Sequence, residues 1–296
     1  MKDEYLYVDE NLQATLGDAA RTLLEQHNDA RYIEDGKGIV KVPLERWQLA
    51  QRYERRTWME DAAHATDDRN DEHAASFDHY AAIAGRAFDR AIELGCGPFT
   101  NLRVLARHMS IGRCVLLDPL IASYPAHRHC TYRHGRVKVA PSGLERSLGT
   151  SLPGRALRRL VRTVRPAWLE QGIPVERKLA FPIEEMPACG AFDLVVMINV
   201  LEHCFDAPRI FEALLRISKP GAAFVFHDRL YDTGEVESES RHRFDAGHPL
   251  RIGTPVIMDF LARHFDALHQ RVADVADHAH GIDLSGRGIY FIGVRR

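Results

Sequence analysis

The sequence predicts an α/β fold in which helices cover both faces of a mainly parallel sheet. Two apolar segments carry this prediction: Phe88–Leu94 runs into Gly95, and Cys114–Leu117 runs into Asp118. Each segment has the length and composition of a buried strand, and the helical segment Thr100–His108 lies between them. Strand, helix and strand in this order favour two parallel neighbours joined by a crossover.

The turn after the first strand reads Gly95-Cys96-Gly97. Glycine in a turn between a strand and a helix lets a ligand approach the backbone N–H groups at the helix start, because no side chain intervenes. Asp118, followed by Pro119, ends the second strand, where a carboxylate can accept hydrogen bonds from both hydroxyls of a ribose. Together these features predict a Rossmann-like, nucleoside-binding half.

The ligand class follows from the residues around the turn. A dinucleotide would favour a small residue at the sixth position of the glycine motif, where this chain has Thr100 after the bulky Phe99. Glu93, two residues before Gly95, disfavours two phosphates in the turn but suits a positive ammonium or sulfonium group. S-adenosylmethionine carries both groups, so we expect it as the cofactor.

From about Tyr80 to the C-terminus the chain resembles the class I S-adenosylmethionine-dependent methyltransferases. Beyond the glycine turn, Phe181–Pro187 is similar to that family's adenine-side loop and Phe192–Met197 to its fourth strand. Asn199–His203 is similar to the segment that faces the methyl group in many small-molecule members. The resemblance implies a seven-stranded sheet, and it implies the following cofactor contacts: Tyr80, Glu93, Gly95, Gly97, Asp118, Pro119, Ile183, Glu184 and Asn199.

Within that set, Tyr80 is expected either to donate its hydroxyl to the cofactor carboxylate or to lie in the core, and Glu93 is expected to meet the amino acid end of the cofactor. Pro182 stands where the family often has a polar adenine contact, so the Ile183 backbone and the Glu184 side chain are expected to replace it. Pro98-Phe99 stands in place of the family's third glycine.

The later elements follow in the order that the resemblance implies. Asp206 is expected to cap a helix that runs to Ser218, because its side chain can accept a backbone N–H and Pro208 suits the first turn. Lys219-Pro220-Gly221 ends this helix. The remaining expected elements are a strand over Ala222–His227, a helix over Val256–His264 and a closing strand over Gly288–Val294.

We expect residues 1–72 to form an N-terminal helical cap or lid and residues 73–296 the cofactor-binding domain, with a linker or a helix break over Thr66–His73. Asn11–Gln26 predicts an amphipathic helix, Arg31–Val42 a short strand pair, and Pro43 opens a second helix. One face of that helix carries four residues at helical spacing, which either pack on the main domain or form a lid: Trp47, Gln51, Glu54 and Trp58.

Residues 119–171 are too long for a simple crossover and predict a basic insertion after the second strand. Ten Lys/Arg oppose two Glu between Pro119 and Glu170. Arginines from Arg155 to Arg165 line one side of an amphipathic helix within it. The arginine side of this helix has three competing interpretations. It is a solvated face, a cap that recognises an anionic acceptor, or a surface that binds RNA, a membrane or a partner.

Methyl transfer is an in-line displacement that needs alignment and exclusion of water, with a base for a hydroxyl or a protonated amine. His203 or His227 is the expected base, with Asp228 orienting it and Asn199 positioning the acceptor. His248 is the third histidine expected at the pocket rim. The expected substrate is a small, polar and anionic metabolite methylated on O or N.

Three alternatives stay open at this point. A non-methylating enzyme would transfer the aminocarboxypropyl group of the same cofactor or cyclise it. A regulatory scaffold would keep the fold without chemistry. An RNA methyltransferase would use the arginine helix, but the aromatic residues needed for base stacking are few there.

Composition limits the partners and the classes of protein that remain possible. The net charge of -2 and the pI near 6.8 argue against nucleic acid or an anionic membrane as partner. No apolar run reaches the ~20 residues of a membrane span, and the acidic start is unlike a signal peptide, so we expect a cytoplasmic protein. Five scattered cysteines show neither a disulfide framework nor metal-ligand spacing. The N-terminal helices could exchange in a homodimer.

Overall fold

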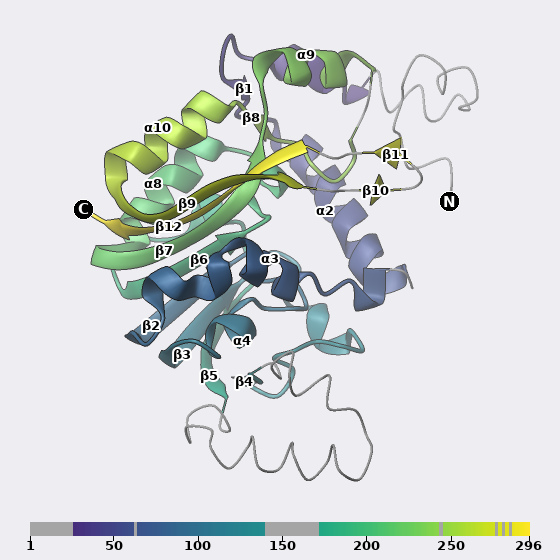
Figure 1. The fold of residues 1–296 in the computed structure, drawn as a ribbon. Helices are drawn as coiled ribbons and strands as arrows, with labels where there is room; N and C mark the ends of the chain where they lie inside the picture. The colour runs from purple at the N-terminus through teal and green to yellow at the C-terminus, as the bar shows by residue number, and fades with distance from the viewer. Residues whose placement is uncertain are drawn as a thin grey trace.

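The computed structural model describes residues 26–61, 64–139, 172–242, 245–275, 278–279, 282–283 and 286–296. Its central element is an eight-stranded sheet in the order β4-β5-β3-β2-β6-β7-β12-β9 (Figure 1). Strands β5, β3, β2, β6 and β7 are parallel, whereas β12 is antiparallel to both β7 and β9. The strands are β2 (Ala87–Leu94), β3 (Ser110–Leu117), β4 (Arg136–Val137), β5 (Ile173–Leu179), β6 (Phe192–Ile198), β7 (Ser218–Leu230), β9 (Phe265–Val275) and β12 (Gly286–Arg295).

Helices cover both faces of this sheet. Helices α3 (Asn70–Ser76) and α4 (Leu102–Leu105) lie on one face, and α8 (Ala207–Ile217) and α10 (Thr254–His264) lie on the other (Figure 1). Successive strand residues point to opposite faces. Thus Ala91 belongs to the core beneath α3 and α4, whereas Ile92 belongs to the core beneath α8 and α10.

The N-terminal part lies beside the carboxyl ends of the parallel strands. Helix α2 (Leu44–Glu60) passes alongside this end of the sheet (Figure 1). Strand β1 (Gly38–Ile39) pairs with β8 (Arg251–Ile252), which joins the N-terminal part to the C-terminal half. The other elements are η2 (Asp29–Tyr32), η3 (His64–Thr66), η4 (Asp78–Ile83), η5 (Tyr124–Ala126), η6 (Ile183–Glu185), η7 (Leu201–His203), α9 (Thr233–His242), β10 (His278–Ala279) and β11 (Ile282–Asp283).

The predicted α/β fold is confirmed, with corrections to single elements. The five strands located in the sequence are present, but the sheet has eight strands where seven were expected, with the two-residue β4 as an antiparallel edge. The helix expected over Thr100–His108 is limited to Leu102–Leu105, and β7 begins directly at Ser218. The strand pair expected over Arg31–Val42 reduces to a Glu34–Gly38 bridge, because β1 pairs with β8 instead.

Two predicted elements cannot be compared with the structure. The N-terminal amphipathic helix lies, apart from Gln26, outside the described residues, and the arginine helix over 155–165 lies wholly outside them.

The predicted linker over Thr66–His73 contains the start of α3 at Asn70, so the expected boundary at residue 72 falls within a helix.

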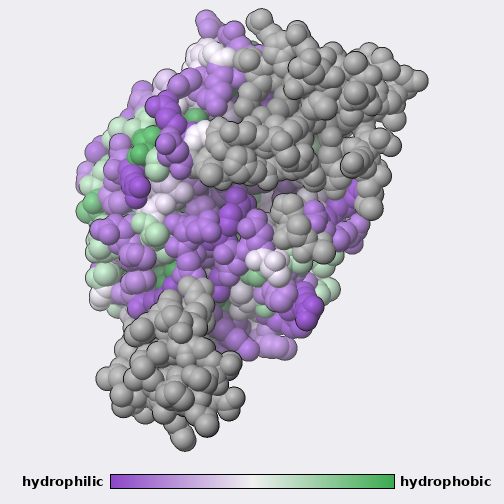
Figure 2. Space-filling model, turned by 45° about the vertical axis from the view of Figure 1, so that its right-hand side comes forward, coloured by the Kyte–Doolittle hydropathy of each residue, from purple (hydrophilic) through white to green (hydrophobic). Residues whose placement is uncertain are grey.

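The surface visible in Figure 2 is mainly hydrophilic, with hydrophobic residues in small scattered groups. Within the described ranges, the large hydrophobic side chains that are exposed are Leu44, Leu268 and Val272. No helix in this part of the chain combines the length and apolar character needed to cross a bilayer.

Candidate active site

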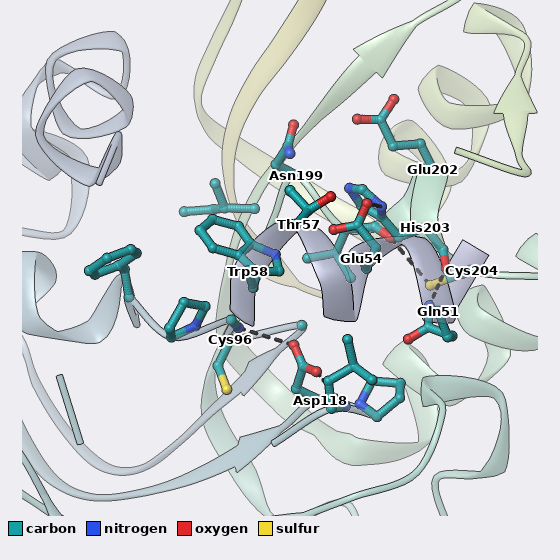
Figure 3. A pocket seen from close by; sticks show the side chains of 18 of the residues that line it. Gln51, Glu54, Thr57, Trp58, Cys96, Asp118, Asn199, Glu202, His203 and Cys204 are labelled. Atoms are coloured by element: carbon teal, nitrogen blue, oxygen red, sulfur yellow. Dashed lines mark hydrogen bonds and ion pairs between the residues drawn. The ribbon is translucent and has the colours of Figure 1, made fainter. Parts of the chain in front are cut away.

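A cavity lies beyond the carboxyl ends of β2, β3 and β6, which is where ligands bind in open α/β sheets. Helix α2 crosses it, and Glu54, Thr57 and Trp58 of that helix line its wall (Figure 3). Asp118 lies on one side of α2 in this view, and Asn199, Glu202 and His203 lie on the other. The cavity therefore has a glycine-turn end near Asp118 and a second end near His203.

The glycine turn is built as its sequence requires. Gly95 and Gly97 have φ values of 64° and 51°, in the left-handed region that glycine adopts without strain. A Cβ on Gly95 would lie 2.5 Å from the Val200 side chain, whereas a Cβ on Gly97 would meet nothing within 4 Å. Gly95 is thus required by packing, and Gly97 leaves open space on the cavity wall.

Asp118 lines the cavity beside this turn. Its carboxylate accepts hydrogen bonds from Gly97 N at 3.1 Å and from Leu120 N at 2.8 Å, so both oxygens are oriented by backbone. Burial raises the pKa of Asp118 to about 6, although these two N–H groups lower it. Asp118 is therefore an ordered acceptor at the end of β3, and Pro119 lines the cavity next to it.

Glu93 is not among the residues that line the cavity, and its expected contact with the cofactor stays a prediction. Its buried carboxylate accepts from Asn101 N at 2.7 Å, from Asn101 Nδ2 at 3.1 Å and from the Thr100 hydroxyl. It therefore caps the start of α4, whose first N–H groups have no partner within the helix. Burial raises the pKa of Glu93 to about 7, despite these donors.

Tyr80 is also placed away from the cavity. Its ring is fully buried and stacks on Phe77 with centroids 5.3 Å apart, and its hydroxyl has no hydrogen-bond partner among the described residues. Tyr80 is not among the residues that line the cavity, and its expected contact with the cofactor carboxylate stays a prediction.

The expected adenine-side residues Ile183 and Glu184 do line the cavity. Glu184 Oε1 accepts from the N–H groups of Phe205 at 2.8 Å and Asp206 at 3.1 Å. Among the described residues, Glu184 Oε2 is buried without a hydrogen-bond partner. A buried acceptor of this kind is costly to leave unpaired.

Asn199 and His203 lie at the second end of the cavity (Figure 3). Asn199 has a φ of 59°, a conformation that Asn tolerates better than most residues, and its N–H donates to His227 O at 2.8 Å. His203 Nδ1 lies 3.2 Å from Gly247 O and 3.6 Å from Glu54 Oε1. Both residues are thus held in place by backbone contacts.

The structure places His227 and Asp228 outside the lining of the cavity. His227 is fully buried, does not line the cavity and stacks on Tyr290 with ring centroids 4.0 Å apart. Its Nδ1 bonds to Ile289 O at 2.9 Å, so Asp228 does not orient it. The Asp228 carboxylate instead accepts from Val200 N at 3.1 Å and Leu201 N at 2.6 Å, which fixes the turn before η7.

Helix α2 supplies the residues that hold η7 in place. Trp47 Nε1 and Gln51 Nε2 both donate to His203 O, at 3.1 and 3.4 Å. Trp47 also packs on Phe205, and Trp58 meets Phe99 edge to face. All four residues of the predicted helical face line the cavity.

A second histidine, His248, completes this end of the cavity. Its Nδ1 lies 2.7 Å from Asp245 Oδ2, and its Nε2 lies 3.8 Å from Glu202 Oε1. Burial lowers the pKa of His248, but the Asp245 and Glu202 carboxylates outweigh burial and raise it to about 10. Our interpretation of the sequence placed His248 at the rim but missed Asp245 and Glu202. The Asp-x-x-His spacing was a usable signal, because it lets the two side chains meet in a loop.

An α/β sheet with a glycine turn and an ordered acid at the ends of adjacent parallel strands is the arrangement that binds nucleosides in open α/β folds. A family model described as "Methyltransferase domain" matches residues 64–265, which is more than half of the 296 residues. The chain therefore belongs to this family and is an S-adenosylmethionine-dependent methyltransferase. No curated protein matches the sequence.

Two solved structures illustrate what the chain is similar to. The N-methyltransferase NodS from Bradyrhizobium japonicum WM9, in complex with S-adenosyl-L-homocysteine, is 15% identical with a TM-score of 0.47, covering 83% of this chain and 98% of that one. The 1,6-didemethyltoxoflavin-N1-methyltransferase of Burkholderia thailandensis is 14% identical with a TM-score of 0.46, covering 89% and 97%.

Proposed function

We propose that this enzyme methylates an O or N atom of a small polar molecule, which enters the cavity at the end formed by Asn199 and His203. The observation that carries the proposal is the position of Asp118, an ordered carboxylate on the cavity wall directly beside the glycine turn. When bound, S-adenosylmethionine supplies an electrophilic methyl group on a sulfonium.

The residues present fit this cofactor. The open space at Gly97 leaves room for a ligand against the turn, and Asp118 suits the two hydroxyls of a ribose. The unpaired Glu184 Oε2 suits an amino donor on the adenine side, where Ile183 supplies an apolar wall. These residues, with Gly95 and Pro119, are the proposed cofactor contacts.

The acceptor end is polar and enclosed by α2. His203 is retained as the residue that faces the acceptor, since it lines the cavity whereas His227 does not. Asn199 is proposed to position the acceptor. Helix α2 is proposed to act as the lid that excludes water, because its polar and aromatic face covers both ends of the cavity.

The charge of the acceptor stays a prediction. The arginine helix that suggested an anionic metabolite lies outside the described residues. Among the described residues that line the cavity, Arg69 is the single Lys or Arg, and its Nε lies 3.3 Å from Asp67 Oδ2. This part of the wall therefore adds no support for an anionic substrate.

Calorimetric titration with S-adenosylhomocysteine tests the proposal. We expect Asp118→Ala to weaken binding by about 2 to 4 kcal/mol, because ribose hydroxyls lose their acceptor in a buried site. Asp89→Ala, which removes an exposed acid from the other end of β2, should bind like the wild type. Equal affinities for wild type and Asp118→Ala would refute the assignment of this wall to the ribose.

A further inference from the structure

Three side chains from distant parts of the sequence meet at the acceptor end of the cavity. Glu54 comes from α2, His203 from η7 and His248 from the segment before β8. One nitrogen of each imidazole and one oxygen of Glu54 lie within 4.8 Å of one another. Among the described residues this is the one group of His, Cys, Asp or Glu side chains with such spacing.

His248 is oriented as metal ligands usually are, whereas the nitrogen of His203 beside Glu54 is Nδ1, which lies 3.6 Å from Glu54 Oε1. His203 Nδ1 lies 3.2 Å from Gly247 O, and His248 Nδ1 lies 2.7 Å from Asp245 Oδ2. A carbonyl or carboxylate beside Nδ1 favours a proton on that nitrogen, which leaves Nε2 as the nitrogen that can bind a metal once its own proton is displaced. Histidines that bind metal typically donate their other ring N–H to such acceptors.

Further contacts support the same arrangement. Glu202 Oε1 lies 3.8 Å from His248 Nε2, while Tyr231 donates to Glu202 Oε2 at 3.1 Å, so one oxygen of Glu202 faces the cluster. A Cβ on Gly247 would lie 2.8 Å from Glu54 Oε1, so glycine at this position allows α2 to approach. The cluster is thus rich in oxygen and imidazole donors and opens into the cavity.

We propose that Glu54, His203 and His248 bind one divalent transition metal ion, with Glu202 as a further oxygen donor. Two imidazoles with carboxylate oxygens suit Zn²⁺, Co²⁺ or Mn²⁺ rather than Mg²⁺ or Ca²⁺, which prefer oxygen donors alone. The ion would keep a coordination position toward the cavity, where it could hold and polarise the O or N atom of the acceptor. With the ion bound, His203 is a ligand and not a free base.

The role in acceptor binding rests on the proposed function, whereas metal binding itself does not. The full chain, freed of metal by a chelator, should be titrated with Zn²⁺ by calorimetry and with Co²⁺ by visible absorption. We expect one ion per chain with an affinity in the micromolar range or tighter. Glu54→Gln and His248→Asn should each weaken this affinity by about 100-fold, as loss of a ligand costs at least as much as loss of its supporting residue.

Two controls separate the possible outcomes. His129→Asn removes an exposed histidine outside the cluster and should bind Zn²⁺ like the wild type. S-adenosylhomocysteine should still bind to all three variants, which shows that the nucleoside end is folded. Zn²⁺ binding that is absent, or that persists unchanged in Glu54→Gln and His248→Asn, overturns the metal site. Zn²⁺ binding at the cluster without any S-adenosylhomocysteine binding would instead overturn the proposed function.

Discussion

Glu93 and Asp118 both stand at the end of a buried strand, yet only the Asp118 carboxylate lines the cavity. The difference lies in the donors near each group. The Thr100 hydroxyl and the Asn101 N–H enclose the Glu93 carboxylate, whereas Asp118 receives backbone N–H groups from the glycine turn and the following loop. Sequence position predicted a ligand role for both, because it does not show which donors surround an acid.

The raised pKa of Asp118 leads to a pH-dependent affinity. Burial raises this pKa to about 6, and the ionised form is the better acceptor for two hydroxyl groups. We therefore expect S-adenosylhomocysteine affinity to be constant above this pH and to fall by up to about tenfold per pH unit below it. Calorimetry between pH 5 and 8 checks this, and Asp118→Asn should show weaker binding that varies little with pH.

At the scale of elements, apolar runs predicted the buried strands well because these strands are covered on both faces. Strand β9 was missed: it is an edge strand with exposed Leu268 and Val272, and it lacks a continuous apolar run. Helix α4 is shorter than predicted, and Glu93 caps its start. The two alternatives for α2, a lid or a helix packed on the main domain, do not exclude each other. Its aromatic side chains pack on the main domain and also line the cavity.

A buried ionic network ties α2 to the segment that carries His248. Arg46 Nε donates to Asp29 Oδ1 at 2.9 Å, and the same guanidinium donates to the backbone carbonyls of Asp245 and Ala246. Arg251 Nη1 lies 3.7 Å from Asp29 Oδ2. All three charged side chains of this network are almost fully buried.

Removing Arg46 should therefore be strongly destabilising. We expect Arg46→Met to lower the free energy of unfolding by about 3 to 5 kcal/mol, because the buried Asp29 loses its closest counter-ion. Urea unfolding measures this, with the exposed Arg55→Met on the same helix as the matched control. A loss of less than about 1 kcal/mol, like that of a surface ion pair, would contradict a structural role.

At the scale of the whole molecule, two histidines join the layers on the α3 side of the sheet. The rings of His73 in α3 and His227 in β7 lie 5.0 Å apart, and His227 stacks on Tyr290 of β12. Burial lowers the pKa of His73 to about 3 and that of His227 to about 4. Both imidazoles are therefore neutral in the folded protein at neutral pH.

These histidines should make the fold sensitive to acid. Each is neutral when folded but takes up a proton near pH 6.5 when unfolded, so its stabilising contribution is present above pH 6.5 and is lost toward pH 4. His227→Phe keeps the stacking and removes one titrating group. We expect its loss of stability between pH 6.5 and 4 to be less steep than that of the wild type by about 1.4 kcal/mol per pH unit.

Urea unfolding at several pH values provides the comparison. Burial raises the pKa values of the acids Glu93 and Asp228 to about 7 and 8. As the pH falls, their protonation increases the free energy of unfolding, whereas protonation of the histidines decreases it. These acids are the same in both proteins, so the difference between the two curves reports His227 together with its neighbour His73, whose pKa His227 also lowers. Parallel curves would show that His227 does not titrate on unfolding.

The sequence by itself determined the α/β class, the main strands and the glycine turn with Asp118, because these depend on local hydrophobic pattern and on short motifs within one crossover. Only the tertiary structure decided which side chains reach the cavity. The side chains of Glu93, His227 and Asp228 are hydrogen-bonded to backbone groups instead. Glu54, His203 and His248 meet because α2 and the segment before β8 are packed against η7 by long-range contacts that no local pattern encodes.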